Sequence, residues 1–300
     1  YFVRIISDRW VGSEDTVALS FKHLLLPDLE YGSAASRHTE LLDLHPLPLT
    51  ALRDPRFERL YEGKFTHFNP VQTQTFHTLY NTDGNVLVGA PTGSGKTIMG
   101  ELAILRLLKK NPRAKTVYVA PLKALARERV KDWRVKLKVL GLRVEELSGD
   151  ITPDMSRLKD ANVIITTPEK WDGVSRGWAR REYVTQVELL LIDEIHLLGV
   201  DRGPVIEVIV SRMQYIAAQT RKHIRIVGLS TALANAQDLG DWMGITEGGG
   251  GEGHGAVFNF RASVRPVPMT IHIRGFPEKN YCPRMATMNK PAYAAILEHS

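Results

Sequence analysis

Five short apolar runs, separated by longer stretches of mixed polarity, dominate the chain between residues 85 and 230. They cover residues 85–89, 116–120, 162–166, 188–192 and 224–230. The runs are nearly continuous in Val, Ile and Leu, as is typical of parallel strands buried on both faces, and the stretches between them are long enough for crossover helices. The pattern predicts a doubly wound α/β domain with a parallel sheet, its core spanning about residues 65–245.

The segments that precede these runs follow other patterns. Residues 1–27 alternate apolar and polar positions around a turn expected at 12–15, which predicts a β hairpin. The hairpin either closes a preceding β domain or belongs to the main domain. Residues 28–64, with Pro46 and Pro48, are expected to form a linker and a lead-in helix. A further helix is predicted from Pro70 to about Tyr80, with Asn69 as its N-cap.

The carboxyl-terminal part is less regular. Residues 248–255 consist almost entirely of glycine, which loses the most entropy on ordering, so a flexible loop is expected there. Residues 258–274 alternate again between apolar and polar positions. Residues 276–300 are expected to form a tail that leads to a further lobe of the protein.

The clearest chemical signal lies between the first apolar run and a predicted helix. Residues 90–97 fit the phosphate-loop pattern G-x-x-x-x-G-K-[ST], with Ala in place of the first Gly. The glycines let backbone N–H groups converge on a phosphate, the Lys bridges the β- and γ-phosphates, and the Thr hydroxyl binds Mg²⁺. A turn with chance resemblance is the alternative. The predicted ATP-binding residues are Ala90, Pro91, Thr92, Gly93, Ser94, Gly95, Lys96 and Thr97.

A pair of carboxylates follows the fourth run. Asp193 and Glu194 stand at the carboxyl end of a predicted strand, where open α/β sheets bind ligands. In a phosphate-loop enzyme the Asp holds Mg²⁺, commonly through water, and the Glu can act as general base on the attacking water. Adjacent carboxylates at a strand end are otherwise solvated. Together with the phosphate loop, they predict a catalytic set of Lys96, Asp193 and Glu194, with Thr97 and Asp193 at the metal.

Composition narrows the class of protein. The net charge of +6 and the pI near 9.3 favour a polyanionic partner. Cys282 is the only cysteine, which excludes an intramolecular disulfide and favours the nucleus or the cytoplasm. No apolar run approaches the roughly 20 residues of a membrane-spanning helix, so no membrane partner is expected. The histidines show no metal-ligand spacing, so no metal other than Mg²⁺ is expected.

The order of the motifs is similar to that of the superfamily 2 helicases, and the longer strings resemble their Ski-like branch. These strings are Phe68-Asn69-Pro70-Val71-Gln72, the phosphate loop, Ala120-Pro121-Leu122-Lys123-Ala124-Leu125, Thr166-Thr167-Pro168-Glu169-Lys170-Trp171-Asp172-Gly173, Asp193-Glu194-Ile195-His196 and Ser230-Thr231-Ala232-Leu233-Ala234-Asn235-Ala236. The resemblance implies a RecA-like ATP-binding lobe over residues 65–275. It also implies that residues 1–27 end a fibronectin-like domain, in a protein with two helicase cassettes in tandem.

The resemblance also assigns residue roles. Gln72 would contact the adenine edge, and Phe68 would pack on the base, although an aromatic residue at a helix entry is commonly a core residue. Ser230 and Thr231, with His196, would relay the state of the γ-phosphate to the nucleic acid. Backbone contacts to the nucleic acid would come from Pro121, Leu122 and Lys123 and from Thr167, Pro168 and Glu169.

The function implied is that of the first motor lobe of an ATP-dependent helicase that moves 3′ to 5′ along single-stranded or partly duplex nucleic acid, within a multiprotein complex. The nucleic acid is DNA or RNA, including ribosome-associated RNA. The alternative is a regulatory cassette that binds nucleotide and partner proteins without turnover. Such helicases take arginine fingers from a second lobe. We find no Arg-rich string after residue 236, so the second lobe is expected outside this chain, and the chain alone is expected to hydrolyse ATP poorly.

Overall fold

The computed structural model describes residues 2–6, 13–18, 38–149, 153–199, 203–245 and 255–299. They divide into two compact units, residues 1–37 and 38–300. In the first unit, β1 (Phe2–Ile6) and β2 (Glu14–Ala18) pair in antiparallel fashion, which confirms the predicted hairpin. Ile6 pairs with Glu14, so Glu14 and Asp15 belong to β2 and not to the predicted turn.

The second unit contains a seven-stranded parallel sheet in the order β5-β6-β4-β7-β8-β3-β9. Its strands are β3 (Val86–Gly89), β4 (Lys115–Val119), β5 (Val144–Leu147), β6 (Val163–Thr166), β7 (Val187–Ile192), β8 (Arg225–Ser230) and β9 (Ala256–Asn259). All five apolar runs form strands, and the predicted doubly wound α/β fold is confirmed. The sequence did not predict β5. Of the alternating stretch 258–274, only the first two residues lie in a strand.

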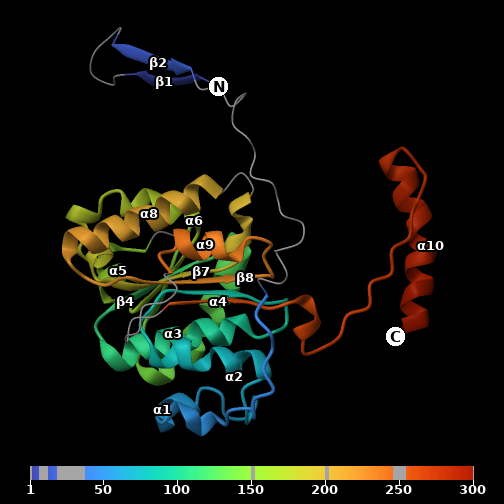
Figure 1. Ribbon diagram of the computed structural model, residues 1–300, viewed down its shortest axis with the longest axis horizontal. Helices are drawn as coiled ribbons and strands as arrows, with labels where there is room; N and C mark the ends of the chain where they lie inside the picture. The colour runs from blue at the N-terminus through green and yellow to red at the C-terminus, as the bar shows by residue number, and fades with distance from the viewer. Residues whose placement is uncertain are drawn as a thin grey trace. The chain divides into compact units, whose positions relative to one another are not determined.

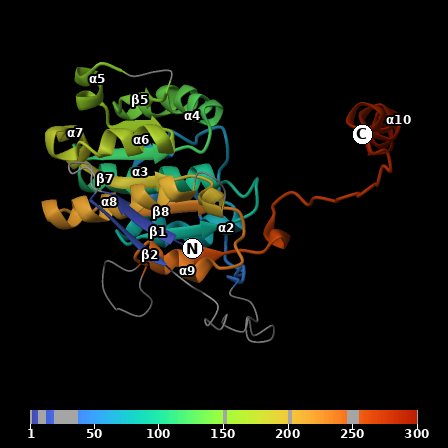
Figure 2. The ribbon, with the colours of Figure 1, turned by 90° about the horizontal axis from the view of Figure 1, so that it is seen from above.

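Helices cover both faces of the sheet (Figure 1). On one face lie α2 (Pro70–Phe76), α3 (Lys96–Lys110) and α4 (Lys123–Lys136); on the other lie α6 (Pro168–Ser175), α8 (Gly203–Thr220) and α9 (Ala236–Trp242). Figure 2 shows α6 and α8 side by side along the sheet. The remaining helices are α1 (Pro55–Glu58), α5 (Met155–Asp160), α7 (Glu182–Thr185) and α10 (Tyr281–His299). None of the described helices combines the length and hydropathy of a membrane span.

Alternation along each strand divides the core in two. On β7, for example, Leu189 and Leu191 pack with α3 and α4, whereas Leu190 and Ile192 pack with α6 and α8. Successive side chains of a strand point to opposite faces, so a strand covered on both sides is apolar throughout. This two-sided burial explains why the strands are continuous apolar runs in the sequence.

The described segment before the sheet, from residue 38 onward, packs within the second unit. α2 begins at Pro70 as predicted, with a capping box between Asn69 and Gln72, and continues into a π-helical turn (His77–Asn81). Upstream, the Thr39 N–H donates to the Asn259 carbonyl at 2.8 Å. The described part of the predicted linker 28–64 therefore lies against the sheet unit. Residues 28–37, and the predicted glycine loop except Gly255, lie outside the described residues.

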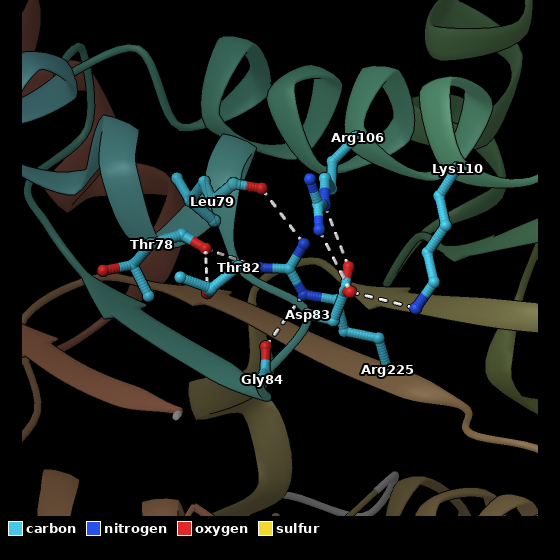
Figure 3. Close-up of polar contacts among 8 residues, drawn as sticks. All are labelled: Thr78, Leu79, Thr82, Asp83, Gly84, Arg106, Lys110 and Arg225. Atoms are coloured by element: carbon cyan, nitrogen blue, oxygen red, sulfur yellow. Dashed lines mark hydrogen bonds and ion pairs between the residues drawn. The ribbon is translucent and has the colours of Figure 1, made fainter. Parts of the chain in front are cut away.

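A buried arginine fixes the amino-terminal edge of the sheet (Figure 3). At the start of β8, Arg225 donates to the carbonyls of Thr78, Leu79 and Gly84 at 2.8, 3.0 and 2.8 Å. Burial lowers the pKa of Arg225 to about 10. Asp83 lies beside it and accepts from Arg106 at 2.9 Å. These contacts fix the entry into β3, whose other end leads into the phosphate loop.

Candidate nucleotide site at the carboxyl edge of the sheet

Five of the six predicted motifs meet at one edge of the sheet. The phosphate loop follows β3, and Asp193 and Glu194 follow β7. Ser230 is the last residue of β8, and Thr231 comes directly after it. β8 lies between β3 and β7. The two predicted nucleic-acid loops follow the neighbouring strands β4 and β6. Because all these strands are parallel, their carboxyl ends share one edge, which is where open α/β sheets bind ligands.

Two glycines shape the phosphate loop. Gly93 and Gly95 have φ angles of +89° and +83°, in the left-handed region that side chains with a Cβ disfavour. The loop is attached to β8 by the Ala90 N–H, which donates to the Ser230 carbonyl at 2.9 Å. α3 starts directly after Gly95, so its first N–H groups lie at the loop. This combination of a helix N-terminus and left-handed glycines is suited to an anion.

Lys96 lies at the end of the loop on one side of β8, and the two carboxylates follow the strand on its other side. Its Nζ donates to the Ala90 carbonyl at 2.9 Å. Burial lowers the pKa of Lys96, while the Glu194 and Asp193 carboxylates act in the opposite direction and raise it. The ammonium group therefore lies within the field of both carboxylates, which brings three predicted catalytic residues into one site.

The carboxylates are held in defined positions. The Asp193 N–H donates to the Val119 carbonyl at 3.0 Å, and Asp193 Oδ1 accepts from the Glu194 N–H at 3.1 Å. Asp193 Oδ2 accepts a short hydrogen bond from the Tyr118 hydroxyl. Burial, followed by the Asp193 charge, raises the pKa of Tyr118 well above its usual range, so the hydroxyl remains a donor. Glu194 has a φ of 52°, a conformation that costs about 1–3 kcal/mol and is concentrated at functional sites.

His196 connects the carboxylates to β8. Its Nδ1 lies 3.3 Å from Glu194 Oε2 and 3.3 Å from Ser230 Oγ. Ser230 is fully buried at the end of β8, directly beside the strand that carries the phosphate loop. The structure thus brings together the predicted relay residues His196 and Ser230, and Thr231 lines a 570 Å³ pocket with Pro91 and Thr92.

The two residues predicted to meet the base have different surroundings. Gln72 lies against the phosphate loop: its Nε2 donates to the Gly95 carbonyl at 3.4 Å, and its Oε1 accepts from the Asn69 N–H at 3.0 Å. Phe68 is 1% exposed and lies among Tyr61, Phe65 and Phe76. A ring with no free face cannot stack on a base, so this placement corrects the expected role of Phe68 to that of a core residue.

The predicted nucleic-acid loops lie side by side. The Ala120 N–H donates to the Thr166 carbonyl at 2.8 Å, directly before Pro121 and Thr167. Leu122, Lys123 and Glu169 are exposed, whereas Pro121, Thr167 and Pro168 are buried. The first residues after β5, which the sequence did not predict as part of the site, also lie at this edge. β5 ends at Leu147, and a Cβ on Gly149 would lie 3.3 Å from Lys123 Nζ.

Comparisons with known proteins agree with this arrangement. A family model described as DEAD/DEAH box helicase matches residues 69–239. Over its whole length the chain is 60% identical to activating signal cointegrator 1 complex subunit 3 of Gallus gallus and 58% identical to DExH-box ATP-dependent RNA helicase DExH14 of Arabidopsis thaliana. The solved structure of DEAD-box helicase Mss116 bound to ssRNA and UDP-BeF has a TM-score of 0.59 and 20% identity, covering 73% of this chain and 46% of Mss116.

The extent of these matches determines what they show. The chain spans 13% of the length of each of the two curated relatives. The likeness to Mss116 shows the RecA-like fold alone. The family model, however, covers more than half of the chain, from Asn69 to α9, and includes the motifs at the carboxyl edge of the sheet. The chain therefore belongs to the DEAD/DEAH box helicase family, as its resemblance to the Ski-like superfamily 2 helicases predicts.

Proposed function

We propose that this chain is the ATP-binding first motor lobe of a helicase that couples ATP hydrolysis to 3′ to 5′ movement along a nucleic-acid strand. The observation that carries the proposal is geometric: the phosphate loop with Lys96 follows β3, the Asp193–Glu194 pair follows β7, and only β8 separates them at this edge of the sheet. A phosphate loop alone indicates nucleotide binding. A carboxylate pair facing it supplies the metal ligand and the base that hydrolysis needs.

The residues fit ATP with Mg²⁺. Residues 90–97 would hold the phosphates, with the left-handed Gly93 and Gly95 exposing the N–H groups of the loop. The Thr97 hydroxyl and Asp193, through water, would hold Mg²⁺, which supplies charge neutralisation at the phosphates. Among the described residues, no group of three His, Cys, Asp or Glu side chains is placed to bind a metal. Mg²⁺ does not need such a group, since it commonly uses one or two carboxylates together with phosphates and water.

The remaining residues would perform coupling and substrate binding. Glu194 would activate the attacking water. Its contact with His196, which in turn contacts Ser230, would transmit the state of the γ-phosphate to β8. The loops after β4 and β6 would hold the sugar-phosphate backbone of DNA or RNA without reading bases. The other helicase lobe would complete the site with arginine fingers. The relative named as a cointegrator complex subunit suggests that this protein also works in a complex, in the nucleus or the cytoplasm.

The proposal is tested on the full-length protein with DNA and RNA duplexes that carry either a 3′ or a 5′ single-stranded tail. We expect ATP hydrolysis to rise with single-stranded nucleic acid, and strand separation to require ATP and the 3′ tail. A protein that binds ATP but shows neither stimulated hydrolysis nor strand separation would contradict the motor function and favour the regulatory alternative.

One prediction concerns the exposed lysine after β4. Replacing Lys123 by Ala should weaken binding of single-stranded nucleic acid to a similar degree for all sequences, because the ammonium group would contact phosphate. It should also reduce the slope of log affinity against log salt by about 1. The measurement is fluorescence anisotropy with labelled oligonucleotides over a range of salt concentrations.

The matched control is Lys131→Ala, an exposed lysine on the same helix α4, about 12 Å farther from the sheet edge at 1.5 Å per residue. It should leave the salt dependence unchanged. Equal losses in the two variants would mean that the basic helix acts as a whole and that the loop after β4 has no specific contact.

A further inference from the structure

We propose that Tyr118 is a positioning residue for Asp193: its hydroxyl fixes the orientation of the carboxylate that would hold Mg²⁺. The inference rests on the proposed role of Asp193 and assigns a role to a buried residue near the carboxyl end of β4. Tyr118 is 2% exposed and lies on β4, next to Leu191 of β7 in the register of the sheet.

The two oxygens of Asp193 are held by different partners. Oδ2 accepts from the Tyr118 hydroxyl, and Oδ1 accepts from the Glu194 N–H at 3.1 Å. A carboxylate has a broad torsional preference about its last bond, so one contact leaves its plane poorly defined, whereas two contacts on separate oxygens define it. Partners that orient a metal ligand contribute strongly to metal affinity; their loss typically costs 10–100-fold.

Tyr118 is itself anchored by a buried cluster. Its ring meets the Trp133 ring edge-on, with centroids 5.0 Å apart and an interplanar angle of 71°. Trp133 Nε1 donates to Glu101 Oε1 at 2.9 Å, and Lys136 Nζ lies 2.5 Å from Glu101 Oε2. Glu101 is 1% exposed and belongs to α3.

The cluster lies between the helix of the phosphate loop and Asp193. α3 begins with Lys96 and Thr97 and carries Glu101. The cluster runs from this helix through Trp133 of α4 and Tyr118 of β4 to the Asp193 carboxylate, which follows β7. Both halves of the proposed metal site, Thr97 and Asp193, thereby rest on one rigid core. The Arg129 side chain of α4 also interacts with this hydroxyl, so the hydroxyl lies between a guanidinium and the Asp193 carboxylate.

The test measures Mg²⁺ dependence of nucleotide binding and so does not rely on turnover. A fluorescent, non-hydrolysable ATP analogue is bound to the full-length protein, and MgCl₂ is titrated. We expect Tyr118→Phe, which keeps the ring and removes the hydroxyl, to raise the MgCl₂ concentration at half-maximal binding by about 10-fold. Binding of the analogue without Mg²⁺ should stay unchanged.

A matched control is Tyr80→Phe. Tyr80 is also 2% exposed, and its hydroxyl donates to the Leu52 carbonyl at 2.6 Å, away from the carboxylates. This variant also loses a buried phenol hydroxyl, so it should lower the unfolding temperature without moving the MgCl₂ midpoint. A shift of the midpoint as large as that of Tyr118→Phe would overturn the proposal.

A double-variant cycle separates positioning from general damage. In an Asp193→Asn background, Tyr118→Phe should have almost no further effect on the MgCl₂ midpoint, because the two residues act as one unit. If Tyr118→Phe shifts the MgCl₂ midpoint by the same factor with and without Asp193→Asn, the inference is overturned. If Asp193→Asn shifts the midpoint and Tyr118→Phe does not, the inference alone fails. If Asp193→Asn itself has no effect, the proposed role of Asp193 fails and the inference fails with it.

Discussion

Replacing Glu194 by Gln is expected to lower the nucleic-acid-stimulated kcat for ATP hydrolysis by about 10²–10⁴-fold while nucleotide affinity stays close to that of the unsubstituted protein. The amide keeps the size of the side chain but cannot accept a proton from the attacking water. The protein would still bind ATP through residues 90–97, which this change leaves intact. Steady-state hydrolysis and equilibrium binding of a non-hydrolysable analogue, both on the full-length protein, measure the two effects separately.

The matched control uses the same strand. Glu188→Gln makes the same chemical change near the start of β7, where Glu188 Oε1 accepts from Asn111 at 2.8 Å. It lies at the opposite edge of the sheet and should leave kcat unchanged. Turnover that is stimulated by nucleic acid but indifferent to Glu194→Gln would exclude this lobe as its source, and would favour a regulatory cassette that binds nucleotide without hydrolysing it.

The sequence predicts those parts of the fold whose cause is local. Strands buried on both faces are apolar along most of their length, so β7 and β8 are visible as nearly continuous apolar runs. The cap of α2 is visible because Asn69 and Pro70 satisfy or avoid the free N–H groups at a helix start. The strand ends carry residue types that few other functions need together, and the structure places the phosphate loop and the Asp193–Glu194 pair at the same edge of the sheet.

Features that depend on distant contacts were not predicted. β5 is an edge strand with Glu145 and Glu146 between two apolar residues, so it lacks the continuous apolar pattern. The burial of Phe68 depends on three aromatic residues that the fold brings around it. Tyr118 is an ordinary strand residue in the sequence. Its hydrogen bond to Asp193 follows from the pairing of β4 with β7, which no local pattern encodes.

The same buried cluster predicts the largest effect on stability. Lys136 and Glu101 form an ion pair whose side chains are 8% and 2% exposed. Lys136→Met keeps much of the side-chain volume but leaves the Glu101 carboxylate buried without its cation. Removing one partner of such a pair costs about 3–5 kcal/mol, mainly because the remaining charge is desolvated and uncompensated. We expect this loss in the opening free energy of α3 and α4, measured by native-state hydrogen exchange of the full-length protein.

Two further variants determine whether the uncompensated charge is the cause. Glu101→Gln combined with Lys136→Met removes both charges, while the amide oxygen can still accept from Trp133, so most of the loss should be recovered. Arg143→Met breaks the exposed pair with Asp160, whose side chains are 66% and 61% exposed, and should change the opening free energy by no more than about 1 kcal/mol. A double variant as unstable as Lys136→Met alone would show that the cluster is held by the packing of the lysine stem. In that case the ion pair would not be what stabilises the packing of α3 against α4 next to Tyr118.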